Sequence, residues 1–194
     1  RLEDVVAKAR SSGIKVVLAD TALRNQSGDF LITADYRQIG KAMAEHAFTH
    51  FPEGEPINAL VIGSMPNTTS MTNLVESLVQ AFSERANARI ISATYSFTDE
   101  AIARDITRNA LLSDPSINLV FALEEYTAHG VANALTDSSN IHFIAFGTTQ
   151  FEIQLLEKGV IDALVVVNSF NLGYRSVMAA IDLLNGNKPA RKLV

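Results

Sequence analysis

Residues 118–123, Asn-Leu-Val-Phe-Ala-Leu, form a short and nearly continuous apolar run that stops at the acidic pair Glu124-Glu125. An amphipathic helix would interrupt such a run every few positions, and a half-buried strand would alternate with polar residues. A short unbroken run is instead typical of a strand buried on both faces of a parallel sheet. Carboxylates directly after it suit the positive end of a helix dipole. The stretch therefore predicts one strand–loop–helix unit of an α/β protein.

The same unit recurs along the whole chain. Comparable apolar runs cover residues 15–20, 58–63, 89–95, 141–147 and 162–168, and a shorter one covers 30–33. Between them, apolar residues recur at steps of three and four, as they do in amphipathic helices. Alternating strands and helices predict an α/β, doubly wound fold with parallel sheets and helices on both sheet faces.

Local signals predict several helix ends. Thr98 stands before Asp99 and Glu100 and is expected to be the N-cap of the helix that follows. Gly159 and Gly186 each follow a helical stretch, as C-cap glycines do. The first residues, Arg-Leu-Glu-Asp, read as the middle of a helix and not as a signal peptide. We therefore expect a fragment or a processed product.

Composition excludes several classes of function. The chain has 194 residues, of which 47% are hydrophobic and 19% charged, which is typical of a folded globular protein. The net charge of −5 gives no positive field, so we expect no nucleic-acid binding by this segment. Cysteine is absent, which excludes disulfides, thiolate metal sites and cysteine nucleophiles.

Catalytic and cofactor motifs are also missing. The chain has no G-x-S-x-G elbow, no phosphate-binding G-x-x-x-x-G-K-[ST] loop and no dinucleotide-binding G-x-G-x-x-G. His46 and His50 have the spacing of two metal ligands on a helix, but no third ligand is evident, and a solvated helix face is the simpler interpretation. His129 and His142 are interpreted as packing or surface residues. We expect no enzyme, no cofactor and no metal site.

Binding chemistry is expected where the strands end. In an open parallel sheet, ligands bind outside the carboxyl ends of the strands. Hydroxyl, amide, carboxylate and aromatic side chains follow the predicted strands, and such groups bind a neutral polyol or another small polar solute. Each of them could equally be a helix N-cap. The candidate ligand-binding residues are Asp20, Asp35, Tyr36, Thr68, Glu124, Thr148 and Asn168.

The order of these motifs resembles the ribose-type periplasmic binding proteins and the related effector domains of LacI-type repressors. Residues 12–20 are similar to the family's GIPVVxxD strand, and residues 118–134 to its strand and helix with the pattern aiFaxNDxxAlGaxxAL. Residues 144–147 resemble vvGFD, and residues 158–163 with 168–174 resemble GxidatvxqnpyxmGy. The Ala34-Asp35-Tyr36 stretch, with Gly40 after it, resembles the DN…G crossing between lobes.

This resemblance implies a two-lobed, type I binding protein that closes on its ligand about a hinge. It divides the chain into residues 1–35 as part of lobe one, 36–167 as lobe two, and 168–194 as the return to an incomplete lobe one. The implied function is an extracytoplasmic solute-binding protein that captures a sugar or sugar-like ligand for an ABC importer or a membrane sensor. The implied partners are that solute, a membrane permease or sensor, and a possible second copy in a homodimer.

Three departures from the family pattern concern the ligand. The family's Asn-Asp after the Phe-Ala strand is Glu124-Glu125 here, the Asp of GFD is Gly147, and the helix after Gly63 lacks the usual Arg. In the family that this chain resembles, the missing Asp and Arg side chains bind aldopyranoses through charge-assisted hydrogen bonds. Their loss disfavours ribose as the ligand. An anionic Glu124 would suit a cationic or hydroxyl-donating ligand.

The alternative is the effector domain of a LacI-type cytoplasmic repressor. The residues upstream of Arg1 would distinguish the solute-binding protein from the repressor. A signal peptide there predicts a periplasmic or extracellular protein, lipid-anchored or free. A DNA-binding motif there predicts a cytoplasmic repressor. An enzyme of flavodoxin-like fold is the third interpretation, and the missing catalytic motifs disfavour it.

Overall fold

The computed structural model describes residues 2–24, 28–135 and 140–189. The chain divides into two compact units. Unit 1 comprises residues 1–35, 68–70 and 167–194, and unit 2 comprises residues 36–67 and 71–166.

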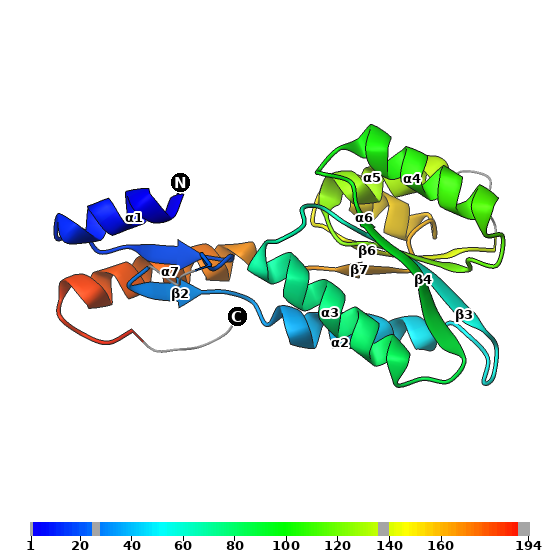
Figure 1. Ribbon diagram of the computed structural model, residues 1–194, viewed down its shortest axis with the longest axis horizontal. Coiled ribbons are helices and arrows are strands. Elements are labelled where there is room, and N and C mark those ends of the chain that lie inside the picture. The colour runs from blue at the N-terminus through cyan, green and yellow to red at the C-terminus, as the bar shows by residue number, and fades with distance from the viewer. Residues whose placement is uncertain (1, 25–27, 136–139, 190–194) are drawn as a thin grey trace. The chain divides into compact units, whose positions relative to one another are not determined.

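A five-stranded parallel sheet forms the centre of unit 2 (Figure 1). Its strand order is β4-β3-β5-β6-β7, so the chain winds outward in both directions from β3 and β5. The strands are β3 (Ile57–Gly63), β4 (Ala88–Tyr95), β5 (Leu119–Ala122), β6 (His142–Phe146) and β7 (Ala163–Val165). Every residue of β3 and β5 is buried, as the unbroken apolar runs predict.

Helices cover both faces of this sheet, as predicted (Figure 1). Helices α2 (Tyr36–Phe48) and α3 (Thr69–Ser83) pack on one face, where Val61 and Phe121 point toward them. Helices α4 (Glu100–Ser113), α5 (Glu125–Ala134) and α6 (Gln150–Glu157) cover the other face, where Leu60 and Val120 point. Successive strand residues therefore serve opposite cores, because side chains alternate along a strand.

One glycine permits a close approach between two of these helices. Gly130 lies in α5 where it crosses α4, and a Cβ atom there would lie 2.3 Å from the carbonyl oxygen of Glu100 and 2.6 Å from Ala103 Cβ. Both distances are far inside van der Waals contact. Only a residue without a side chain allows the two backbones to pack this closely.

The described residues of unit 1 form two short parallel strands and two helices. The elements are α1 (Leu2–Ser11), β1 (Val17–Ala19), β2 (Phe30–Ile32) and α7 (Ser169–Leu184), and α7 contacts both strands. One face of α7 exposes large apolar side chains, with Phe170 84% and Leu184 73% exposed. No helix in the described ranges is long and apolar enough to span a membrane.

The structure corrects two local predictions. Thr98 is not the N-cap of α4. It has a positive φ of 62°, and Asp99 caps the helix by accepting a hydrogen bond from the Ile102 N–H at 2.9 Å. His50 is not on a helix face, because α2 ends at Phe48 and His50 lies in the turn after it. The C-cap glycines are confirmed, since Gly159 and Gly186 have φ values of 70° and 74° after α6 and α7.

Candidate functional site

The carboxyl ends of the strands in unit 2 meet at one edge of the five-stranded sheet, called the carboxyl edge below. The parallel registers align Gly63 with Tyr95, Ile62 with Ala122, Ala122 with Ala145 and Phe146 with Val165. The residues that follow these positions therefore share the edge where open α/β sheets bind ligands.

Glu124 acts first as a helix cap at this edge. It is the N-cap of α5, and its carboxylate accepts hydrogen bonds from the N–H groups of Tyr126 and Thr127, both at 3.2 Å. The Thr127 hydroxyl donates a third bond to Oε2 at 3.2 Å and lies 2.7 Å from the buried Ser96 hydroxyl after β4. Three of the roughly four acceptor positions of the carboxylate are thus used inside the protein.

A second carboxylate, that of Glu152, fills the space beside Gly147. A Cβ atom at Gly147 would lie 2.2 Å from Glu152 Oε1, so no larger residue fits while Glu152 keeps this position. Glu152 Oε2 accepts hydrogen bonds from the backbone N–H and the hydroxyl of Thr149, at 2.8 and 3.0 Å. The side chain of Glu152 is fully buried. A carboxylate therefore lies next to the position of the family's missing Asp, but it is supplied from the first turn of α6.

His129 lies against Glu152 beneath two aromatic rings. Its Nε2 is 3.7 Å from Glu152 Oε1, and both atoms are buried without a hydrogen-bond partner among the described residues. The Phe151 ring packs edge-on at 4.4 Å between centroids, and the Tyr126 ring at 6.1 Å. His129 therefore packs between the buried carboxylate and the two rings, and its Nε2 faces Glu152 Oε1.

Aromatic rings on neighbouring elements also lie at the carboxyl edge. Tyr126 is 50% and Phe151 40% exposed in the first turns of α5 and α6. Phe97, two residues after β4, is 56% exposed and has a φ of 56°, which is unusual for a bulky residue. At the start of α2, the Tyr36 ring stacks on Phe146, the last residue of β6, with 6.5 Å between centroids.

The predicted ligand-binding residues divide between the two units. Tyr36, Glu124 and Thr148 lie at the carboxyl edge of unit 2, where Thr148 is exposed. Asp20, Asp35, Thr68 and Asn168 belong to unit 1. Asp20 has a φ of 69° and accepts the Thr33 hydroxyl on its carbonyl oxygen at 2.6 Å, and Asn168 caps α7 by accepting from the Asn171 N–H at 2.9 Å. Their role in binding a ligand stays a prediction.

Sequence reasoning missed Phe97, Phe151 and Glu152. Phe151 and Glu152 follow a predicted strand by a few residues, so a search extended into the first helical turn would have found them. Nothing in the sequence indicates that the Glu152 side chain turns back to Gly147.

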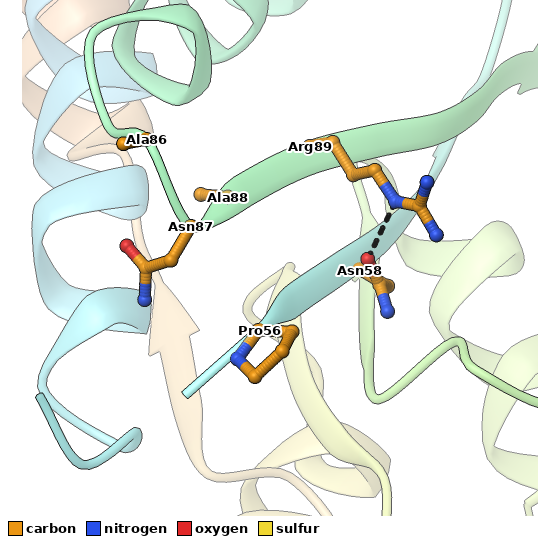
Figure 2. Close-up of a pocket in the computed structure, with 6 residues that line it drawn as sticks. All are labelled: Pro56, Asn58, Ala86, Asn87, Ala88 and Arg89. Atoms are coloured by element: carbon orange, nitrogen blue, oxygen red, sulfur yellow. Dashed lines mark hydrogen bonds between the residues drawn. The ribbon is translucent and has the colours of Figure 1, made fainter. Parts of the chain in front are cut away.

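The opposite, amino edge of the sheet has a pocket of about 440 Å³ (Figure 2). Its polar groups are already paired: Arg89 Nε donates to Asn58 Oδ1 at 2.8 Å, and Asn58 Nδ2 donates to the Ser116 carbonyl at 2.9 Å. Asn118 Oδ1 accepts the Asn58 N–H at 2.8 Å. These bonds tie the starts of β3, β4 and β5 together, which is a structural role. The pocket lining is Pro56, Asn58, Ala86, Asn87, Ala88 and Arg89.

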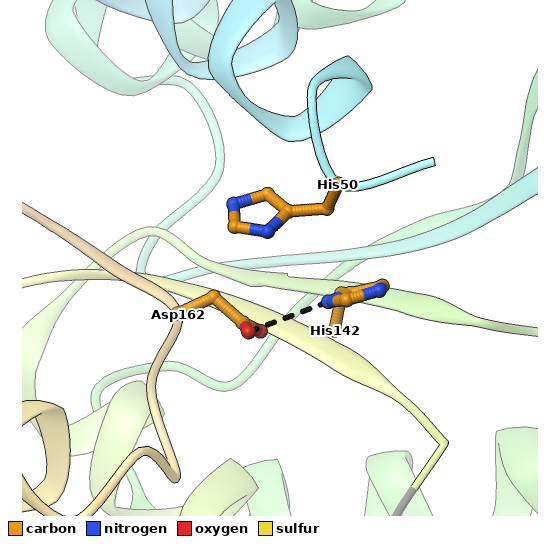
Figure 3. Close-up of side chains that lie close together, drawn as sticks. All are labelled: His50, His142 and Asp162. Carbon is orange, nitrogen blue, oxygen red and sulfur yellow. Dashed lines mark ion pairs between the residues drawn. The ribbon is translucent and has the colours of Figure 1, made fainter. Parts of the chain in front are cut away.

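The amino edge also holds a group of residues able to bind a metal ion. His50, His142 and Asp162 each present a ligand atom, and these atoms lie within 4.8 Å of one another (Figure 3). His142 begins β6 and Asp162 precedes β7, so the sheet brings them together from distant parts of the sequence.

Comparison with known proteins finds similarity to sugar-transport components. A family described as periplasmic binding protein domain matches residues 1–188. The periplasmic component of an ABC-type sugar transport system from Hahella chejuensis is 26% identical, with a TM-score of 0.89 over 97% of this chain and 70% of that one. No curated protein is significantly similar in sequence.

Two further solved structures share the fold. An ABC transporter solute-binding protein from Agrobacterium vitis with bound D-fucose is 22% identical, with a TM-score of 0.89 over 100% of this chain and 68% of that one. A carbohydrate transporter solute-binding protein from Agrobacterium radiobacter, in complex with D-arabinose, is 18% identical, with a TM-score of 0.87 over 96% of this chain and 66% of that one.

Proposed function

The chain belongs to the periplasmic binding protein domain family, and from this premise we propose that it binds a neutral, polyhydroxylated solute of the sugar class. The observation that carries the proposal is the chemistry of the carboxyl edge. There, the exposed rings of Phe97, Tyr126 and Phe151 share the edge with the Glu124 carboxylate and the Thr148 hydroxyl, and such groups bind sugar rings by stacking and hydrogen bonding.

The hydrogen bonds of Glu124 favour a hydroxyl-donating ligand over a cation. Its carboxylate already accepts three bonds from the start of α5, so about one acceptor position remains. One acceptor suits a single sugar hydroxyl. A cationic amine has up to three N–H donors and binds best to a carboxylate with several free acceptor positions. The second carboxylate, Glu152, is fully buried, which further reduces the attraction for amines.

The proposed mechanism is hinge closure between two lobes. We assign residues 1–35 and 168–194 to lobe one and residues 36–167 to lobe two, and ligand bound by both lobes would stabilise the closed form. The proposed site combines Tyr36, Thr68, Glu124 and Thr148 of lobe two with Asp20, Asp35 and Asn168 of lobe one.

The proposed setting is extracytoplasmic, with a membrane permease or sensor as partner. The Hahella chejuensis protein, a periplasmic sugar-transport component, supports this setting more than the LacI-type repressor alternative. Association into a homodimer stays a prediction, which sedimentation velocity would test.

Isothermal titration calorimetry tests the ligand class. The chain is titrated with a panel of neutral monosaccharides, including D-fucose and D-arabinose, and with aliphatic amines. We expect at least one monosaccharide to bind and the amines not to bind. The variant Tyr126→Ala should weaken sugar binding about fivefold, since a stacked ring contributes on the order of 1 kcal/mol.

The matched control is Leu112→Ala, because Leu112 is an 81% exposed apolar residue at the opposite end of a helix, near the C-terminus of α4. Its sugar affinity should equal that of the wild type. Binding of amines without sugars, or of no member of the panel, would contradict the proposal.

A further inference from the structure

Three residues converge at the amino edge of the unit 2 sheet, away from the proposed sugar site. His142 is the first residue of β6, Asp162 directly precedes β7, and His50 follows the C-terminus of α2. The His50 and His142 rings lie 5.0 Å apart between centroids (Figure 3). Phe51 packs edge-on against His142 at 4.9 Å. We propose that His50, His142 and Asp162 form a binding site for a divalent transition metal ion of the zinc type.

The distances fit metal coordination after a small adjustment. His142 Nδ1 lies 3.3 Å from Asp162 Oδ1. Ligand atoms about 2.0–2.1 Å from a tetrahedral zinc ion are separated from one another by about 3.3 Å. The spacing of His142 Nδ1 and Asp162 Oδ1 therefore already matches that of two neighbouring zinc ligands. All three ligand atoms lie within 4.8 Å, so His50 must shift by on the order of 1.5 Å, which ring rotation in a turn can supply.

Asp162 is held in place for this role. Its Oδ2 accepts the backbone N–H of Phe143 at 2.7 Å, which leaves Oδ1 directed toward His142. The side chains of His142 and Asp162 are 34% and 26% exposed, so an ion can enter from solvent while the site stays partly enclosed. Carboxylates that bind metal ions are commonly oriented by such a hydrogen bond to a group outside the coordination sphere.

The donor set selects the class of ion. Two imidazole nitrogens and one carboxylate oxygen suit Zn²⁺, Ni²⁺ or Cu²⁺, whereas Ca²⁺ and Mg²⁺ prefer oxygen ligands alone. The fourth position is open to water or to His46, whose Nε2 lies 3.4 Å from His50 Nε2. An ion here would link the end of α2 to the starts of β6 and β7, and so stabilise unit 2 independently of any sugar.

The test uses the full chain without a histidine tag. Titration calorimetry with ZnCl₂ at neutral pH should show one ion per chain, and Co²⁺ should give the intense visible absorption of four-coordinate cobalt. The variants His50→Gln and His142→Gln should each weaken Zn²⁺ binding at least about tenfold, while Asp162→Asn keeps the acceptor for Phe143 and should weaken it similarly.

Asp105→Asn is the matched control for Asp162→Asn, since Asp105 is an exposed residue of α4 outside this group, and it should bind Zn²⁺ as the wild type does. Far-UV circular dichroism and the urea midpoint without metal show whether each variant is folded. The proposal is overturned if the wild type binds no Zn²⁺ with defined stoichiometry. It is equally overturned if folded His50→Gln and His142→Gln bind Zn²⁺ with wild-type affinity. Sugar binding does not enter either readout.

Discussion

The close contact between α4 and α5 gives a stability prediction of definite sign. In Gly130→Ala, the new Cβ would lie 2.3 Å from the Glu100 carbonyl oxygen, where a carbon–oxygen contact needs about 3.3 Å. Helix α5 must therefore move away from α4 by about 1 Å. Overpacking of this kind costs about 1–3 kcal/mol, and the upper end applies because the clash is with backbone. The better helix propensity of Ala offsets about 1 kcal/mol.

The net loss in the free energy of unfolding is then about 2 kcal/mol, which urea denaturation followed by far-UV circular dichroism can measure. At a slope of about 2 kcal/mol per molar urea, the midpoint of the unit 2 transition should fall by about 1 M. Gly173→Ala is the control, because Gly173 lies in α7 and no described atom is within 4 Å of the place that the new methyl group would take. It should stabilise α7 by up to about 1 kcal/mol. A Gly130→Ala variant as stable as wild type would refute the close helix contact.

Three further changes test local interactions. The N–H of Val16 and the charge of Arg10 lower the pKa of Asp29, so its contribution to stability is present above about pH 4 and lost as pH falls through the lowered pKa. The difference in the free energy of unfolding between wild type and Asp29→Asn, measured in urea, should be constant between about pH 5 and about pH 7 and become smaller below about pH 4. A difference that grows below about pH 4 would contradict the assignment. Ser96→Ala removes the buried partner of Thr127 and should cost about 1–3 kcal/mol in urea midpoint measurements, whereas a loss below about 0.5 kcal/mol would mean that Thr127 is satisfied by Glu124 alone. Asp99→Ala removes the α4 cap and should cost about 1 kcal/mol by thermal denaturation, and no change would return the cap to Thr98.

The sequence allowed most of the fold to be predicted because the strands are buried on both faces. A run such as Leu119–Ala122 has no polar residue to suggest any other structure, and every residue of it is buried. The strand boundaries were less accurate. The run 162–168 contains a strand of only three residues, Ala163–Val165, because hydrophobicity continues past the last ladder hydrogen bond.

The candidate site was predicted only in part, for reasons of side-chain direction. Glu124 was identified as a possible cap or ligand group, and its three internal hydrogen bonds show the capping role. The Glu152 carboxylate could not be placed from sequence, since its position depends on how α6 leaves β6. The group formed by His50, His142 and Asp162 depends on the pairing of β6 with β7 and on the end of α2, and local patterns carry no information about either.

The Glu152 carboxylate occupies the space that a side chain at position 147 would need, and this constrains how the protein could acquire a new ligand specificity. An acidic residue introduced at position 147 would collide with the existing carboxylate, and loss of Glu152 alone would leave Thr149 and His129 without it. Each single substitution is therefore expected to be harmful, while the pair together is tolerated better. Such epistasis makes the two positions a single unit of evolutionary change. An engineered sugar specificity should accordingly be sought in libraries that vary positions 147 and 152 jointly, because stepwise selection would discard both intermediates.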